Sequence, residues 1–86
     1  MNIQYHRDFE KDYCKLDKKK RKRWLQRLEI FMANPFSVEL NNHPLHGIYD
    51  GYRSINISGD LRAIYKLVSE DMAEFIALDT HSQLYK

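Results

Sequence analysis

The stretch that decides the fold is GYRSINISGDLRAIYKLV, residues 51–68. Residues 52–57 alternate between polar or aromatic and aliphatic side chains, as expected of a strand with two different faces. The following Ser58-Gly59-Asp60 has turn chemistry, because Gly59 adopts a positive φ at no steric cost. Residues 61–68 are again rich in β-forming side chains. The stretch therefore predicts a β-hairpin.

Alternation assigns the side chains of this hairpin to two faces. The face expected to meet a core carries Ile55, Ile57, Leu61, Ala63, Tyr65 and Leu67, together with Arg53 by parity. The opposite face, called here the open face, carries Tyr52, Ser54, Asn56, Arg62, Ile64 and Lys66. A cation anchored on a strand suits contact with a phosphate. On the hairpin alone, however, an amphipathic hairpin with two solvated basic residues is the more economical interpretation.

Length and composition predict one globular domain, residues 1–86. Of the 86 residues, 43% are hydrophobic and 30% charged, which favours a soluble folded chain over a disordered one. No apolar run is long enough to span a membrane, and the polar N-terminus is unlike a signal peptide. The single cysteine, Cys14, excludes an internal disulfide and a site of several thiolates, and we expect it to serve packing. A cytoplasmic location is expected.

Positive charge is concentrated in one run. The net charge is only +2, but residues 18–23, KKKRKR, are all basic. A dense basic run within a predicted helix favours binding to nucleic acid. A solvated helix face and a nuclear-targeting signal are the alternatives. The substrate-binding candidates in this run are Lys19, Lys20, Lys22 and Arg23.

Before the hairpin, the pattern predicts a short strand over residues 2–6 and two helices. The first helix begins at Arg7 or Asp8 and buries Phe9, Tyr13 and Leu16. Asp17 is the expected N-cap of the second, residues 18–33, which ends before Pro35. The expected apolar stripe of this helix is Trp24, Leu25, Leu28, Phe31 and Met32. With so short a linker, the helices should form an antiparallel hairpin.

After residues 36–42, expected to be a loop or single turn, come the β-hairpin and a last strand over residues 73–80. In that strand, alternation places Phe75 and Ala77 opposite Ile76 and Leu78. The resulting order is β-α-α-β-β-β. It predicts an α+β fold, a small antiparallel-rich sheet with the two-helix hairpin on one face.

Histidines are the residues best suited to proton transfer near neutral pH. None of His6, His43, His46 and His81 has a metal-binding spacing, so no metal or other cofactor is expected. His43 precedes the hairpin and His81 follows the last strand, so both can approach the open face near Arg62. For each histidine taken singly, a structural role is the more economical interpretation. Tyr85 suits either an anchor against the sheet or a ring on which a base stacks.

The segment NHPLHGIYDGYRSINISGDLRAIYKL, residues 42–67, and the later DTHSQLY, residues 79–85, resemble a known family. They are similar to the RelE/ParE superfamily of bacterial type II toxins, and most similar to its YafQ-like branch. That branch carries a His-Pro-Leu-x-Gly segment, a Gly-Tyr-Arg strand, an Asp-x-x-x-Ile-Tyr-Lys-Leu strand and a terminal Gly-Thr-His-x-x-Leu-Phe/Tyr. The N-terminal half of the chain is similar only in layout.

The resemblance implies a RelE-like fold and a metal-independent endoribonuclease that cuts messenger RNA in the decoding site of the bacterial ribosome. It also implies a cognate antitoxin, a cytoplasmic location, and no membrane or small-molecule cofactor. The positions that match catalytic or RNA-contacting residues of YafQ-like enzymes are His43, Asp60, His81 and Tyr85, and Arg62 matches a phosphate-contacting arginine of the RelE branch. The chain departs from the YafQ-like pattern at Asn56, Leu61 and Asp79, where that pattern has histidine, tryptophan and glycine.

These residues can supply metal-free cleavage, in which the substrate 2′-hydroxyl attacks the neighbouring phosphorus. Either His43 or Asp60 serves as base, His81 as acid and Arg62 as electrostatic stabiliser. Tyr85 stacks on the substrate, and Asn56 and Lys66 contact it. Two alternatives stay open: a ParE-type inhibitor of DNA gyrase, which the pair of histidines disfavours, and a non-catalytic RNA-binding domain that uses only its basic helix.

Overall fold

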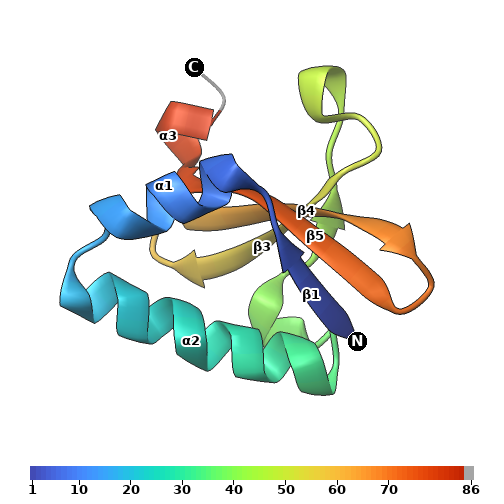
Figure 1. The fold of residues 1–86 in the computed structure, drawn as a ribbon, viewed down its shortest axis with the longest axis horizontal. Helices are drawn as coiled ribbons and strands as arrows, with labels where there is room; N and C mark the ends of the chain where they lie inside the picture. Colours follow the sequence, from blue (N-terminus) through green and yellow to red (C-terminus); the bar gives the residue numbers. More distant parts are fainter. Residues whose placement is uncertain (85–86) are drawn as a thin grey trace.

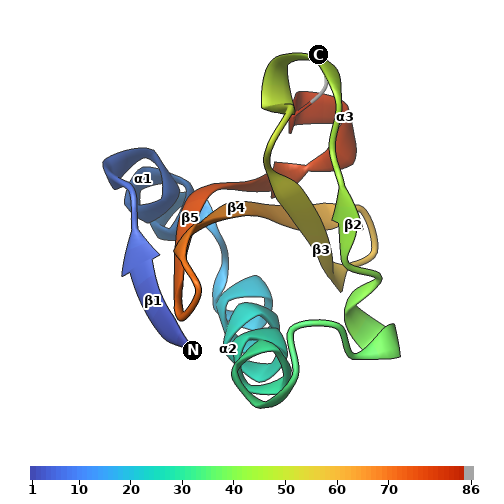
Figure 2. The same cartoon turned by 90° about the vertical axis from the view of Figure 1, so that its right-hand side faces the viewer.

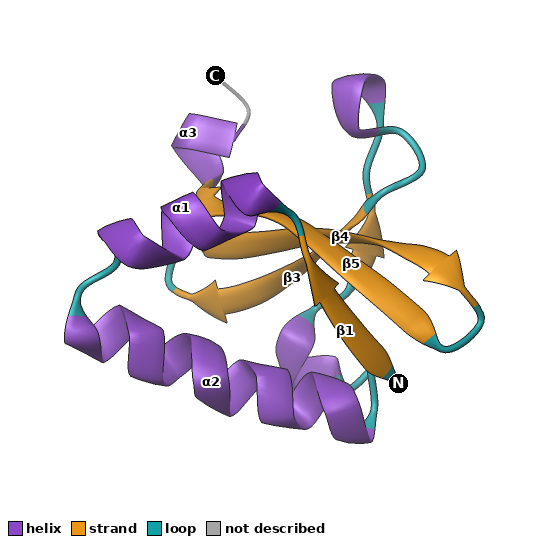
Figure 3. Ribbon diagram, viewed as in Figure 1, coloured by secondary structure: helices purple, strands orange, loops and turns teal. Residues whose placement is uncertain are grey.

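The computed structural model describes residues 1–84 and has the predicted mixed architecture (Figure 1, Figure 3). The elements, in chain order, are β1 (Asn2–Tyr5), α1 (Arg7–Lys15), α2 (Lys18–Ala33), η1 (Val38–Leu40), β2 (His43–Pro44), η2 (Gly47–Tyr49), β3 (Arg53–Ser58), β4 (Leu61–Ser69), β5 (Met72–Thr80) and α3 (His81–Leu84). Within residues 1–84, five strands form one sheet in the order β1-β5-β4-β3-β2. Only the β1–β5 pair is parallel. The predicted order is confirmed, and β2, η2 and α3 are short additions to it.

Side-chain caps set the boundaries of the two long helices. His6 was expected to be the last residue of the first strand, but it caps α1 instead. Its Nδ1 accepts a hydrogen bond from the Asp8 amide at 3.1 Å. Asp17 caps α2 as predicted, since its Oδ1 accepts from the Lys20 amide at 2.8 Å. Asn34 ends that helix, as its position before proline predicts.

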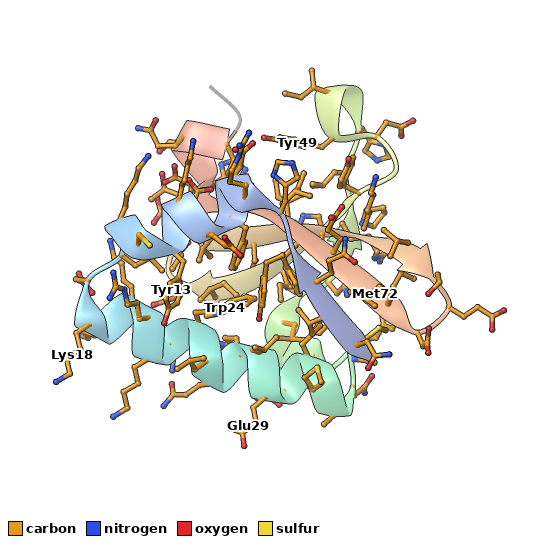
Figure 4. The ribbon with its side chains drawn as sticks, viewed as in Figure 1. Tyr13, Lys18, Trp24, Glu29, Tyr49 and Met72 are labelled. Atoms are coloured by element: carbon orange, nitrogen blue, oxygen red, sulfur yellow. The ribbon has the colours of Figure 1, made fainter. Side chains whose placement is uncertain are left out.

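Both helices pack against the same core and run in opposite directions (Figure 1), and Figure 2 shows them nearly end-on. Phe9 of α1 and Trp24 and Phe31 of α2 are buried against this face. Figure 4 shows Trp24 between α2 and the sheet. From the sheet, the core receives Ile55, Ile57, Leu61, Ala63, Tyr65, Ala73, Phe75 and Leu78. The faces predicted for the hairpin strands are therefore confirmed at these positions.

At the edge of this core, Tyr5 stacks on Phe9 with ring centroids 5.1 Å apart. Burial raises the pKa of the Tyr5 hydroxyl, and the nearby Tyr13 raises it further. A phenol is already neutral at physiological pH, and the raised pKa keeps this one neutral in more alkaline solution, which suits its contact with apolar rings. No helix within residues 1–84 has both the length and the apolar character needed to cross a membrane.

Three residues assigned to the core lie at the surface instead. Leu25 and Met32 are 54% and 45% exposed, because each lies about 100° around the helix from buried Trp24 and Phe31. Leu67 is 51% exposed. Leu67 lies near the end of β4, where the β4–β5 hairpin extends away from α1 (Figure 1).

The alternation predicted for the last strand is wrong because β5 contains a β-bulge. Ile64 pairs with Ala77 and Tyr65 with Phe75, so Ile76 is an extra residue in β5. Phe75 and Leu78 consequently face the helices, whereas Ile76 and Ala77 face the other side. One inserted residue is enough to reverse the parity of every position that follows it.

The open face has a smaller apolar cluster of its own. Leu45, Ile64 and Leu84 are buried there. Tyr49, Tyr52, Ile76 and Ala77 pack against them while staying partly exposed. Both faces of β4 are therefore covered, and α3 and the segment around η2 stand on either side of the open face (Figure 1).

Ser54 provides a test of this packing. It is 1% exposed, and its Oγ has no hydrogen-bond partner. Burying an unpaired hydroxyl is unfavourable. We expect Ser54→Ala to raise the free energy of unfolding by about 1 kcal/mol in urea titrations.

Ser69→Ala is the matched control, because the Ser69 hydroxyl is exposed and bonded to Asp71 at 3.1 Å. Its free energy of unfolding should change by less than about 0.5 kcal/mol. A Ser54→Ala protein less stable than the parent would show that this hydroxyl has a stabilising partner.

Candidate active site and nucleic-acid interface

The candidate side chains of the open face lie in rows that cross the strands. The pairing register places Asn56 beside Arg62, and Arg62 beside Asp79. In the neighbouring row, His43 lies opposite Ser54, which lies opposite Ile64. Directly opposed residues project to the same side of a sheet, and Ile64 belongs to the open-face cluster. His43 is therefore on the open face, as the sequence predicted.

Asp60, Arg62 and His81 meet where the β3–β4 turn lies against the start of α3. The Arg62 Nη1 donates hydrogen bonds to the Gly59 carbonyl at 2.7 Å and the Leu61 carbonyl at 3.3 Å. The His81 amide donates to the Asp60 carbonyl at 2.8 Å. Because these bonds use only one nitrogen of the guanidinium, its other donors remain for a ligand.

His43 belongs to the other side of the open face. His43 lies two strands across the sheet from Arg62 and two residues further along, so their Cα atoms are about 12 Å apart. Its Nδ1 lies 2.7 Å from the Asn41 carbonyl oxygen. Asn56 occupies the strand between His43 and Arg62, and its Oδ1 is buried without a hydrogen-bond partner.

Lys66 lies at the far end of the open face from the β3–β4 turn. Its Nζ is 5.4 Å from the centre of the Tyr52 ring, a cation–π contact. Both residues line a hollow of about 670 Å³ that Tyr49 and Leu84 also line. Tyr49 points from η2 across the open face toward α3 (Figure 4). Arg62 and Lys66 are therefore on one face but not in one cluster, about 13 Å apart along β4. Tyr85, also a candidate, lies outside the described residues.

Arg53 points away from the open face, as its parity predicted. Its Nε donates to the Asn42 Oδ1 at 2.7 Å, and its guanidinium stacks 5.2 Å above the Phe36 ring. Asn42 in turn donates from Nδ2 to the Tyr65 hydroxyl at 2.7 Å. Sequence patterns did not predict this network, which fixes the residue next to His43.

The remaining titratable candidates do not assemble a metal site. No group of three or more His, Cys, Asp or Glu side chains within residues 1–84 is arranged to hold a metal ion. Cys14 is exposed, so the packing role expected for it is wrong. Cys14 instead lies at the rim of a groove of about 270 Å³ that Tyr13 and Trp24 also line.

The basic residues of α2 divide into two groups. Lys19, Lys20, Lys22 and Arg23 line a hollow of about 600 Å³ that reaches Ser58, at the β3–β4 turn. Arg21 is used internally, because its Nη2 donates to the Cys14 carbonyl at 2.8 Å. Arg27 is also used internally, since its Nε donates to the Ile57 carbonyl at 3.2 Å. The first group is available for a polyanion, whereas Arg21 and Arg27 stabilise the fold.

The placement of this charge works against the helix itself. The first turn of α2 contains no acidic residue and begins with three lysines, Lys18, Lys19 and Lys20. Cations at a helix N-terminus oppose the macrodipole, where acidic side chains would stabilise it. Figure 4 shows Lys18 pointing outward from this end of α2. A local cost of this kind is typical of a surface used for binding.

Comparison with known proteins assigns the chain to a family. The model for the bacterial toxin of type II toxin-antitoxin system, YafQ, matches residues 1–86. The chain belongs to the YafQ family. It is 32% identical over 89 residues to the mRNA interferase toxin YafQ of Escherichia coli K12, with 98% of this chain and 95% of that protein covered. The resemblance predicted from the motifs is therefore confirmed.

Solved structures of YafQ and related toxins have the same fold as this chain. YafQ from E. coli BL21(DE3) superposes with a TM-score of 0.73 at 29% identity, covering 99% of this chain and 98% of that one. The E. coli YafQ bound to DinJ as a toxin–antitoxin complex gives 0.70 at 30% identity, covering 99% and 97%. A YoeB/ParE toxin from Agrobacterium tumefaciens gives 0.77 at 22% identity, covering 94% and 99%. That last likeness shows only the fold, which confirms the RelE-like architecture.

Proposed function

We propose that this chain, a single toxin domain over residues 1–86, is an mRNA interferase that cuts messenger RNA on the ribosome. Its activity is held in check by a cognate antitoxin, and it acts in the bacterial cytoplasm. The observation that carries the proposal is the grouping of Asp60, Arg62 and His81 at the β3–β4 turn, with Asn56 and His43 across the same face. The relatives named mRNA interferase toxin YafQ supply the substrate class.

The reaction needs a base, an acid and a cation. The base removes the proton from the substrate 2′-hydroxyl as its oxygen forms a bond to phosphorus. The bond from phosphorus to the 5′-oxygen breaks, and the acid gives that oxygen a proton. The products are a 2′,3′-cyclic phosphate and a 5′-hydroxyl. Arg62 stabilises the negative charge that develops on the phosphate, and its bonds to the turn carbonyls hold it in place beforehand.

The order of residues across the sheet supports His43 as the base. From β5 to β2, the face presents His81 after β5, Arg62 on β4, Asn56 on β3 and His43 on β2. In an in-line displacement, the attacking and leaving oxygens lie on opposite sides of phosphorus. A phosphate over Arg62 and Asn56 would then face His43 on one side and His81 on the other. Asp60 is on the His81 side, because its carbonyl accepts from the His81 amide.

Ribosomal RNA is the proposed partner of Lys19, Lys20, Lys22 and Arg23. These side chains line a hollow that reaches the β3–β4 turn, and the Arg62 side chain and the His81 backbone amide are hydrogen-bonded to the same turn. Basic and reactive groups thus flank one edge of the molecule, the left edge in Figure 1. A long polyanion bound along the helix would pass close to the reactive end. Such binding is sensitive to salt because it releases counterions.

Expression of the chain alone should arrest growth by blocking translation, and a co-expressed antitoxin should relieve the arrest. Purified protein added to translating ribosomes identifies the target. Cleaved message, seen only when ribosomes are present, supports the proposal. Trapped breaks in DNA bound to gyrase would indicate a ParE-type inhibitor instead, and undiminished protein synthesis at high protein levels would contradict both.

Replacing Lys19, Lys20, Lys22 and Arg23 together with Gln should weaken ribosome binding and leave the fold intact, because all four are exposed. The salt dependence of binding should also become shallower, since fewer phosphates are neutralised. Sedimentation with ribosomes over a salt series measures both effects.

The contrasting variant is Arg27→Gln, which should mainly lower the free energy of unfolding, by about 1–3 kcal/mol, since it removes hydrogen bonds to two carbonyls. If the fourfold variant bound ribosomes as tightly as the parent at physiological salt, the basic run would be only a solvated surface.

His81→Ala should lower single-turnover cleavage by roughly two to four orders of magnitude, the usual contribution of a positioned proton donor. Its fold should survive because the His81 side chain is exposed. Asn56→His restores the imidazole of the YafQ-like pattern and should raise or preserve the rate. His46→Ala, an exposed histidine outside the row of candidates, is the control and should cleave normally. Parental cleavage by His81→Ala would mean that His81 is not the acid.

A further inference from the structure

The hydrogen bond between the His43 ring and the Asn41 backbone determines where the imidazole carries its proton. The His43 Nδ1 and the Asn41 carbonyl oxygen are 2.7 Å apart. A carbonyl oxygen only accepts, so Nδ1 must carry the hydrogen. In the neutral ring, Nε2 then holds the lone pair, which is the atom that can accept a proton. Free histidine prefers the opposite tautomer, with the hydrogen on Nε2.

An unusual backbone conformation aims this carbonyl at the ring. Asn41 has φ 47° and ψ 48°, in the left-handed region, and is the only non-glycine residue with positive φ within residues 1–84. Its amide donates to the Val38 carbonyl at 3.2 Å and so closes η1. Asparagine tolerates this region better than most residues with a Cβ, and β-branched side chains tolerate it worst. The turn therefore depends on the residue type at position 41.

The next residue anchors the turn to the core. The Asn42 side chain donates to the Pro35 carbonyl at 2.9 Å and the Tyr65 hydroxyl at 2.7 Å, and accepts from the Arg53 Nε at 2.7 Å. Tyr65 is only 1% exposed, so one end of this network is fixed within the core. Asn42 thus holds the segment from the helix side, while His43 lies on the open face.

We propose that Asn41 is a positioning residue for His43. Its left-handed backbone holds the imidazole as the Nδ1–H tautomer and leaves the Nε2 lone pair to take the 2′-hydroxyl proton. The catalytic half of this inference rests on the proposed function, whereas the tautomer is a property of the resting protein. It also makes His43, and not Asp60, the base.

Long-range ¹H–¹⁵N correlation spectra of the labelled protein, in alkaline buffer where the ring is neutral, report the tautomer directly. We expect a protonated Nδ1 and an unprotonated Nε2 for His43. Asn41→Gly should keep this pattern, because glycine adopts positive φ readily. Asn41→Val should shift the ring toward the Nε2–H form. An Nε2–H tautomer in the parent, or a valine variant with the parental tautomer, would overturn the proposal.

Single-turnover cleavage on programmed ribosomes then tests the catalytic half. Asn41→Val should slow the chemical step by roughly ten- to a hundredfold, with binding unchanged, and Asn41→Gly should stay near the parent. If the tautomer shifts in the valine variant and the rate does not fall, His43 is not the base. If the parent cleaves no message at all, the proposed function fails, and the spectra alone still decide how Asn41 holds His43.

Discussion

The rest of the structure depends on the packing of aromatic rings around Phe75. Its centroid lies between 5.1 and 6.4 Å from those of rings on β1, α1, α2 and β4: Tyr5, Phe9, Trp24, Phe31 and Tyr65. Aromatic pairs at these separations add to the stability gained from burial. A chain this short buries little more than half of its unfolded surface, so one such centre accounts for much of its core.

Because Phe75 is held in the core, the irregularity of β5 falls directly after it. Ile76 is the extra residue, and Ala77 and Asp79 thereby come to the open face while Leu78 returns to the core. The bulge thus sets the direction in which the chain leaves β5 and places His81 against the β3–β4 turn. Had the strand been regular, Asp79 would lie among the helices. The arrangement of the candidate residues at this end of the open face is therefore a consequence of core packing several residues away.

Local patterns were sufficient to predict the hairpin, the Asp17 cap of α2 and the face of every candidate on β3 and β4, because strand and helix periods depend only on neighbouring residues. They failed where a distant contact decides the outcome. The parity of Ile76 and Ala77 depends on pairing with β4, and the exposure of Leu67 depends on where the layers end. The bonds from Arg62 to the turn, and the conformation of Asn41, have no periodic signal. The motifs named the candidate residues, but the order of the strands was needed to place His43 and His81 on opposite sides of Arg62.

The separation of His43 from His81 bears on the effect of having asparagine at position 56, where the YafQ-like pattern has histidine. In the proposed reaction, one imidazole takes a proton and the other gives one, so they must be in opposite protonation states at the start of each cycle. A third imidazole at position 56 would lie beside Arg62, whose charge disfavours an added proton. It would therefore act better as a neutral hydrogen-bonding group than as an acid. An asparagine at this position can form hydrogen bonds without titrating. Asn56 thus keeps the hydrogen-bonding part of the histidine's role, which the charge of Arg62 permits. Proton transfer is left to His43 and His81.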